Sequence, residues 1–199
     1  MSKPNSQMVS VGKPHGDGGR VAGGAWYAKT GGGALPNDAT TALASTFTDL
    51  GYLSDDGLTD TIDKNFTDVT AWGGDRVLSV LTSQTESFKF AMLETTLDTL
   101  KVVYGSDNVT DNDGVISVKH NAKGNETFTF VFEIAMTGNR IKRIVVPSAV
   151  VTNLDDVEYK DGDAINYSIE LAALPDADGN TAYEYISAVS TTTSSGSSH

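Results

Sequence analysis

The chain of 199 residues contains no cysteine and few basic residues, with 14 Lys and Arg against 26 Asp and Glu. Without cysteine it can form neither disulfides nor thiolate metal sites. Its net charge of −12 should repel phosphate backbones and anionic lipid, because Lys and Arg supply most of the affinity for both. No segment approaches the roughly 20 apolar residues of a membrane span, and the N-terminus lacks the apolar core of a secretory signal. These absences argue against a nucleic-acid reader, a membrane protein and thiol chemistry, and we expect synthesis in a cytoplasm.

Aromatic residues are also scarce, at 8%, whereas the chain holds 23 Thr, 18 Ser and 20 Gly. Asp outnumbers Glu by 19 to 7. Since Asp favours turns and caps while Glu favours helix faces, the acidic residues are expected in loops. Thr is enriched in strands. The composition therefore predicts a mainly β protein.

Residues that could carry chemistry are sparse. Three histidines have no ligand spacing between them: His15, His120 and His199. The segment 109–120 resembles a calcium loop in its third and fifth positions, but Val109 and His120 occupy the first and twelfth, where carboxylates are needed. We predict no catalytic residue, no cofactor site and no metal site.

The clearest strand has five apolar residues at alternate positions: Phe128, Phe130, Phe132, Ile134 and Met136. This period of two is typical of a strand with one buried face. The sequence 137–139 (Thr-Gly-Asn) predicts a tight hairpin turn into the next strand. The core is expected to begin at Arg76, and further strand candidates lie at 77–83, 86–93, 114–120, 140–151, 163–174 and 182–189.

One segment has helical periodicity, with apolar residues at Leu93, Leu97, Leu100 and Tyr104. We predict a helix over about 95–104, with Thr95 as the N-cap and Gly105 as its stop. Together, these predicted strands and the helix indicate an antiparallel β-sandwich or barrel with one flanking α-helix.

Both ends of the chain differ from its middle. The first 33 residues hold 9 of the 20 Gly, which predicts an extended arm over 1–33, although Trp26 and Tyr27 could form a short strand. Residues 190–199 have the Ser/Thr-rich composition of a disordered tail. The β domain is therefore expected over 34–189.

An acidic ribbon is expected over about 50–75. Residues 46–75 contain seven Asp and one Lys, half of the net charge. Leu58, Ile62 and Phe66 fall on one side of a strand, but Asp60 and Lys64 intervene on that side, so the ribbon cannot bury a full face within one subunit. Turn signals lie at 55–57 and at 73–74. We therefore expect a surface outside the ribbon to cover its apolar residues.

Two ordered stretches carry a family resemblance: LGYLSDDGLT at 50–59, and DVTAWGGDRVLSVLTSQTESFKFAMLETTLDTLKVVYG at 68–105. Together they resemble the major tail tube protein of long-tailed, non-contractile (siphovirus-like) bacteriophages, especially those of actinobacteria. The resemblance covers about 26–189. It implies a β-sandwich that closes into six-fold rings, which stack into the hollow tube that conducts the genome.

The resemblance also implies that the N-terminal arm and the long hairpin loop reach neighbouring subunits. The subunit-interface candidates are Trp26, Tyr27, Tyr52, Leu58, Ile62, Phe66 and Trp72. Further partners would be other tail proteins: the tape measure, tail terminator and distal tail proteins. The protein would reside in the virion after synthesis in the host bacterial cytoplasm.

Within such a tube, the acidity would act on DNA. A wall of carboxylates repels phosphates, so the genome would pass in transient contact without binding. The same charge would also keep a free subunit soluble. Two other classes stay open: a β-sandwich adhesin, capsid decoration or carbohydrate-binding module, which would need aromatic platforms or a working metal loop, and an enzyme.

Overall fold

A computed structural model describes residues 10–15, 24–123 and 126–188. The protein is mainly β, as predicted, with one α-helix, α1 (Leu97–Tyr104), followed by a 3-10 turn, Ser106–Asn108. The strands are β1 (Gly12–Pro14), β2 (Ala25–Lys29), β3 (Thr48–Asp49), β4 (Leu53–Thr70), β5 (Arg76–Met92), β6 (Val109–Asn112), β7 (Val115–Val118), β8 (Thr127–Met136), β9 (Arg140–Leu154), β10 (Tyr167–Ala173) and β11 (Tyr183–Ala188).

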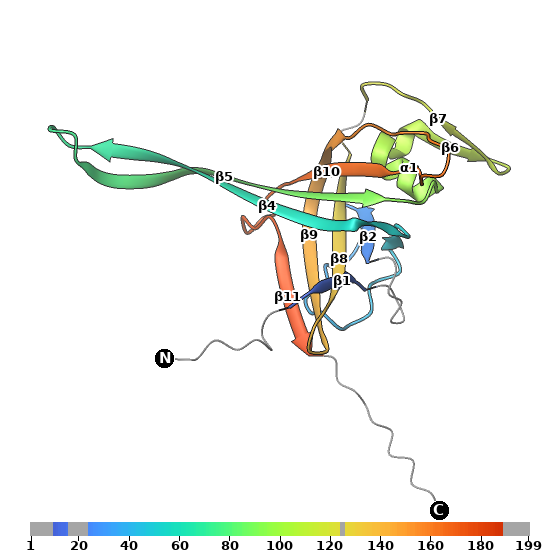
Figure 1. The fold of residues 1–199 in the computed structure, drawn as a ribbon, viewed down its shortest axis with the longest axis horizontal. Coiled ribbons are helices and arrows are strands. Elements are labelled where there is room, and N and C mark those ends of the chain that lie inside the picture. The colour runs from blue at the N-terminus through green and yellow to red at the C-terminus, as the bar shows by residue number, and fades with distance from the viewer. Residues whose placement is uncertain (1–9, 16–23, 124–125, 189–199) are drawn as a thin grey trace, which may run out of the picture.

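Nine of these strands form one antiparallel sheet, with the order β3-β2-β8-β9-β10-β5-β4 along its path (Figure 1). β1 adds to β8, and β11 adds to β9. The long strand β9 changes its partner along its length: residues 140–145 pair with β11, whereas residues 149–154 pair with β10. β6 and β7 form a separate two-stranded hairpin beside α1.

The core lies between two layers of this curved sheet. Phe90 on β5 meets Phe130 and Phe132 on β8, with ring centroids 6.1 and 5.1 Å apart. β5 and β8 share no ladder in the sheet order, so these rings touch across the layers of a sandwich. The alternating residues Phe128, Phe130 and Phe132 are all buried, which confirms the predicted strand. The predicted turn that follows is present, with positive φ at Gly138 and Asn139.

The helix α1 confirms the predicted segment, but its cap is one residue later than expected. Thr96, not Thr95, is the N-cap, and its hydroxyl accepts from the backbone N–H of Thr99 at 3.1 Å. The Thr95 hydroxyl instead lies 3.2 Å from the phenol of Tyr167 on β10. Gly105 ends the helix with φ of 88°, as predicted.

The N-terminal region differs from the expected arm. β2 lies inside the sheet between β3 and β8, and Trp26 on β2 is only 6% exposed. The apolar residues of this short strand are covered by their own chain, so 25–29 belong to the β domain. Residues 1–9 and 16–23 of the expected arm, and the expected tail 190–199, lie outside the described residues.

A buried ion pair ties the N-terminal segment to the sheet. The guanidinium of Arg143 on β9 donates from Nε to Glu133 Oε1 at 2.8 Å, and from Nη1 to the carbonyl of Asp38 at 2.9 Å. His15 Nδ1 lies 3.3 Å from Glu133 Oε2, and the His15 backbone N–H donates to the Glu133 carbonyl at 3.0 Å. Both charges of the pair are buried, so each depends on the other for compensation.

Candidate assembly surface

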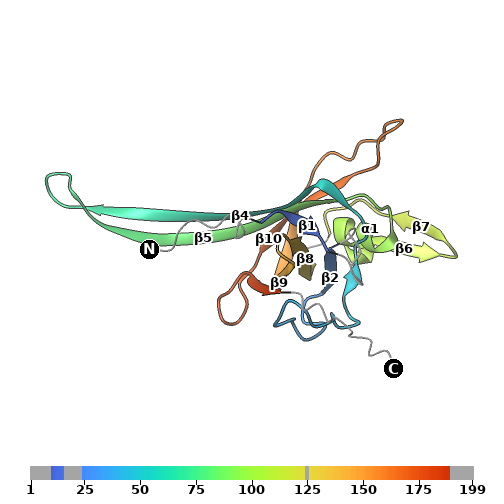
Figure 2. The same ribbon diagram turned by 60° about the horizontal axis from the view of Figure 1, so that its bottom comes forward.

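The hairpin of β4 and β5 projects far beyond the sandwich (Figures 1 and 2). β10 pairs with β5 only over Ser87–Met92, so β4 is the sole ladder partner described for residues 76–86. β4 is itself the last strand in the sheet order. A two-stranded ribbon with two open edges is marginal in water by itself, and open edges are templates for pairing with another chain.

The hairpin is longer than the ribbon expected over 50–75, because β5 runs without a break from Arg76 to Met92. Its first ten residues are exposed and its core residues begin at Glu86, so the core starts later than predicted. The segment 55–57 is a bulge within β4 and not a turn, since the register shifts between Leu53 and Leu58. The turn at 73–74 is present.

Apolar side chains cover both faces of the projecting part. Phe66 lies opposite Leu81, while Val69 lies opposite Leu78. Opposed residues share a face, and faces alternate along a strand, so these two pairs lie on opposite faces of the ribbon. The exposed large apolar residues of the hairpin are Ile62, Phe66, Val69, Trp72, Val77, Leu78, Val80 and Leu81. Contiguous exposed apolar surface of this kind marks an interaction site.

The tip is an ordered turn. Its backbone N–H groups at Ala71 and Gly74 donate to the carbonyls of Asp75 (2.8 Å) and Ala71 (3.0 Å). Gly73 and Gly74 have φ of 114° and 95°, a region that side chains rarely adopt. Trp72 precedes them and is 107% exposed. The turn therefore presents one large, fully exposed ring to solvent.

Acidic groups gather where the hairpin leaves the sandwich. Burial, followed by the nearby carboxylates of Glu86 and Glu184, raises the pKa of Asp60, while Lys142 lowers it. Lys142 Nζ lies 2.5 Å from Glu184 Oε1, and Glu86 accepts a hydrogen bond from the Thr181 hydroxyl. The charged form of Asp60 is therefore disfavoured in the folded subunit.

The predicted interface residues divide into two groups. Ile62, Phe66 and Trp72 are exposed on the hairpin, Tyr52 is exposed just before β4, and Leu58 is half-buried at the base of the hairpin. These five lie along one projecting element.

Trp26 and Tyr27 lie apart from that element, within the sandwich. Both are buried, and the Tyr27 hydroxyl donates to Asp98 Oδ1 on α1 at 2.7 Å. Burial and this hydrogen bond raise the Tyr27 pKa. In the subunit, Tyr27 packs in the main core, whereas Trp26 packs with Val131 and Val145 in a second, smaller cluster.

Sequence reasoning missed four apolar residues of the surface, which it assigned to the core: Val77, Leu78, Val80 and Leu81. The signal that could have found them is their position directly after the Gly73-Gly74 turn. A tight turn forces them to pair with the polar ribbon 66–70.

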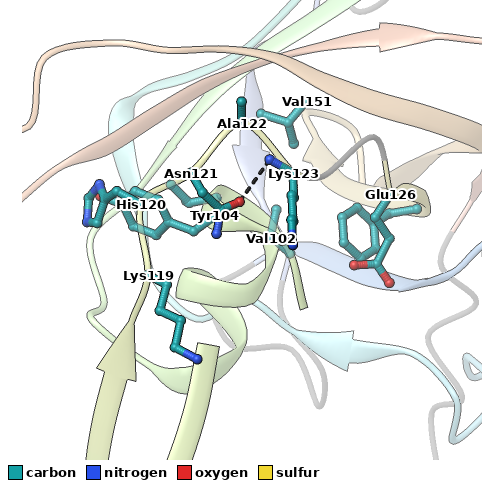
Figure 3. Close-up of a pocket in the computed structure, with 12 residues that line it drawn as sticks. Val102, Tyr104, Lys119, His120, Asn121, Ala122, Lys123, Glu126 and Val151 are labelled. Carbon is teal, nitrogen blue, oxygen red and sulfur yellow. Dashed lines mark hydrogen bonds between the residues drawn. The ribbon is translucent and has the colours of Figure 1, made fainter. Parts of the chain in front are cut away.

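Figure 3 shows a pocket of about 280 Å³ between the end of α1 and the segment after β7. The imidazole of His120 lies against the Tyr104 ring, with centroids 4.6 Å apart. The Lys123 backbone N–H donates to Asn121 Oδ1 at 2.8 Å.

Across residues 10–15, 24–123 and 126–188, no three or more His, Asp or Glu are arranged to hold a metal ion. None of the helices in those ranges has the length and apolar character of a membrane span.

Comparison with known proteins gave a match to a family and matches to solved structures. The family described as "Phage tail tube protein" matches residues 17–195. A solved structure titled "Virion of native gene transfer agent (GTA) particle" is 14% identical with a TM-score of 0.39, over 78% of this chain and 100% of that chain. No curated protein matches the chain. Because the family match spans nearly the whole sequence, this chain belongs to the phage tail tube protein family, and it is a structural protein of a phage virion.

Proposed function

We propose that this subunit assembles with copies of itself into hexameric rings, and that the rings stack into the hollow tail tube through which DNA passes during ejection. The observation that carries the proposal is the β4–β5 hairpin, which exposes apolar side chains on both faces and leaves both edges open. A free subunit leaves this surface in water. Assembly would cover it, at about 25 cal/mol for each Å² of apolar surface buried.

The position of the hairpin favours a head-to-tail contact. The hairpin projects to one side of the sandwich (Figure 2), so its tip would meet a different surface on the next subunit. Contacts between unlike surfaces generate closed rings or open helical stacks. Six-fold symmetry comes from the family resemblance.

The net charge of −12 supports the proposed contact with DNA. In a tube, carboxylates that face the bore would repel phosphate groups. Lys and Arg would be too few to neutralise many phosphates, so passing DNA would release few counterions and bind weakly. The tape measure protein inside the tube, and terminator and distal tail proteins at its ends, would be the other partners.

Negative-stain electron microscopy of the purified protein tests the assembly. We expect hollow tubes of uniform diameter, with six-fold averages in end views. Subunits that stay monomeric at every concentration and salt condition would overturn the proposal. An atomic structure of the assembled tube that shows a neutral or basic bore would overturn only the proposed repulsion of DNA, and would leave the proposed self-assembly standing.

A further inference from the structure

Trp72 at the hairpin tip is the most exposed large apolar side chain among the described residues. Its ring is fully exposed and is flanked by the small residues Ala71, Gly73 and Gly74. No bulky neighbour within this turn would keep the ring from entering a concave surface. An aromatic side chain buries roughly 150–250 Å² when it is enclosed, so this residue has the most surface to gain.

A cavity of about 600 Å³ lies at the other end of the same hairpin. It sits between β1 and the bulged start of β4, within the roughly 300–1,000 Å³ typical of binding clefts. Apolar residues contribute much of its lining: Pro14, Tyr52, Leu53, Leu58, Phe132 and Ile134. The register shift leaves 54–57 outside the β4–β5 ladder, and this bulge forms part of the wall.

Two other cavities are less suited to an indole ring, and a third, beside Trp26 and Phe47, is smaller at about 370 Å³. The one beside the β9–β10 loop, about 500 Å³, carries several carboxylates: Asp56, Asp155, Asp156, Glu158 and Asp163. The pocket of Figure 3 is about half the size of the β1–β4 cavity and is bordered by Lys119 and Lys123. Size and apolar lining both favour the cavity between β1 and β4.

Charged residues of both signs lie at the two surfaces. The tip carries Asp75 and Arg76 directly after its glycines, and Arg76 already pairs with Asp68 at 3.2 Å. The cavity is lined by Lys13 and by the acidic residues Asp55, Asp56 and Glu133. A seated tip can pair Asp75 with Lys13, and Arg76 with Asp55 or Asp56, which favours one orientation of entry.

We propose that the hairpin tip of one subunit inserts Trp72 into the cavity between β1 and the β4 bulge of a second copy of this chain. The proposal rests on the proposed function and names the surface that receives the hairpin. Since tip and cavity lie at opposite ends of one hairpin, each subunit both donates a tip and receives one. Such a contact continues from copy to copy and is not closed within a pair.

Photo-cross-linking tests the contact. Subunits carrying the photoreactive aromatic amino acid p-benzoylphenylalanine at position 72 are co-assembled with an excess of wild-type subunits and irradiated, and the adducts are mapped by mass spectrometry. We expect adducts within 52–58 or 132–134 of a neighbouring copy. The matched control carries the same amino acid at the exposed Val115 of the β6–β7 hairpin and should leave those peptides unmodified. Adducts that map elsewhere in assembled tubes overturn the proposal.

The absence of cysteine allows a second measurement. Subunits with Ala71→Cys and Ser54→Cys together should form disulfide-linked ladders under oxidation, whereas each single variant should not. A ladder of equal strength from Ala71→Cys with Ile186→Cys, at the exposed surface of β11, would contradict the assignment. If wild-type protein forms no tubes, the proposed function fails; if tubes form but both cross-links are absent, only this inference fails.

Discussion

Replacing Phe66 with Ser should weaken assembly strongly while leaving the isolated subunit almost unchanged. Phe66 is 56% exposed on the projecting hairpin, so roughly 110 Å² of an aromatic surface of about 200 Å² stays in water before assembly. At about 25 cal/mol per Å², covering this surface in a tube contributes about 3 kcal/mol per subunit. The variant should therefore need a concentration about 100-fold higher before tubes form.

The assay measures free subunit by sedimentation of assembled tubes, over a range of total protein concentration. Thermal unfolding of the unassembled variant supplies the internal control, and its midpoint should shift by less than about 2 °C, because exposed substitutions change stability by about 0.5 kcal/mol or less. Tyr159→Ser is the matched variant, since Tyr159 is 74% exposed on the β9–β10 loop, away from the hairpin. An unchanged critical concentration for Phe66→Ser, or an equal loss in Tyr159→Ser, would refute the reasoning.

Two further predictions concern charged residues. Arg143→Met should destabilise the subunit by about 3–5 kcal/mol in urea unfolding, because Glu133 would remain buried with only His15 beside it. The double variant with Glu133→Leu should recover most of this loss, and equal losses in both variants would contradict the pairing. Asp60→Asn should stabilise the subunit at neutral pH, because burial and the carboxylates of Glu86 and Glu184 raise the Asp60 pKa and make its charge unfavourable in the fold. The sign follows from linkage: the charged Asp60 destabilises the fold above its folded-state pKa, and this destabilisation disappears below the ordinary Asp pKa. The unfolding free energies of wild type and variant, measured in urea, should therefore converge at acid pH. A stability gain of Asp60→Asn that persists at acid pH would contradict the raised pKa of Asp60.

Several elements could be predicted from the sequence because their causes are local. The alternation of Phe128, Phe130 and Phe132 predicts a strand, although residues 128–133 are buried on both faces, and the glycine at 138 permits the turn that follows. Helical spacing and Gly105 specify α1 to within two residues. The N-cap is Thr96 and not the predicted Thr95. Either hydroxyl can cap the helix, but the Thr95 hydroxyl contacts the phenol of Tyr167 instead.

What could not be predicted depended on neighbours distant in the sequence. Trp26 resembles an interface residue when only its glycine-rich surroundings are considered, and it is buried because β8, a hundred residues later, lies beside it. Leu78 and Leu81 resemble core residues, and they are exposed because β10 ends before reaching them. The same apolar side chain is core or surface according to what lies against it.

The sequence by itself determined the β class, the one helix, the missing catalytic motifs and the presence of an acidic ribbon that cannot cover itself, since composition and short-range periodicity are properties of the chain. Only the tertiary structure decided that the ribbon continues into β5, that both of its faces carry exposed apolar side chains, and that a cavity of about 600 Å³ lies at its base. Those features arise where strands far apart in the sequence meet or fail to meet. The surface proposed for assembly is the part of the sheet that none of the described strands covers.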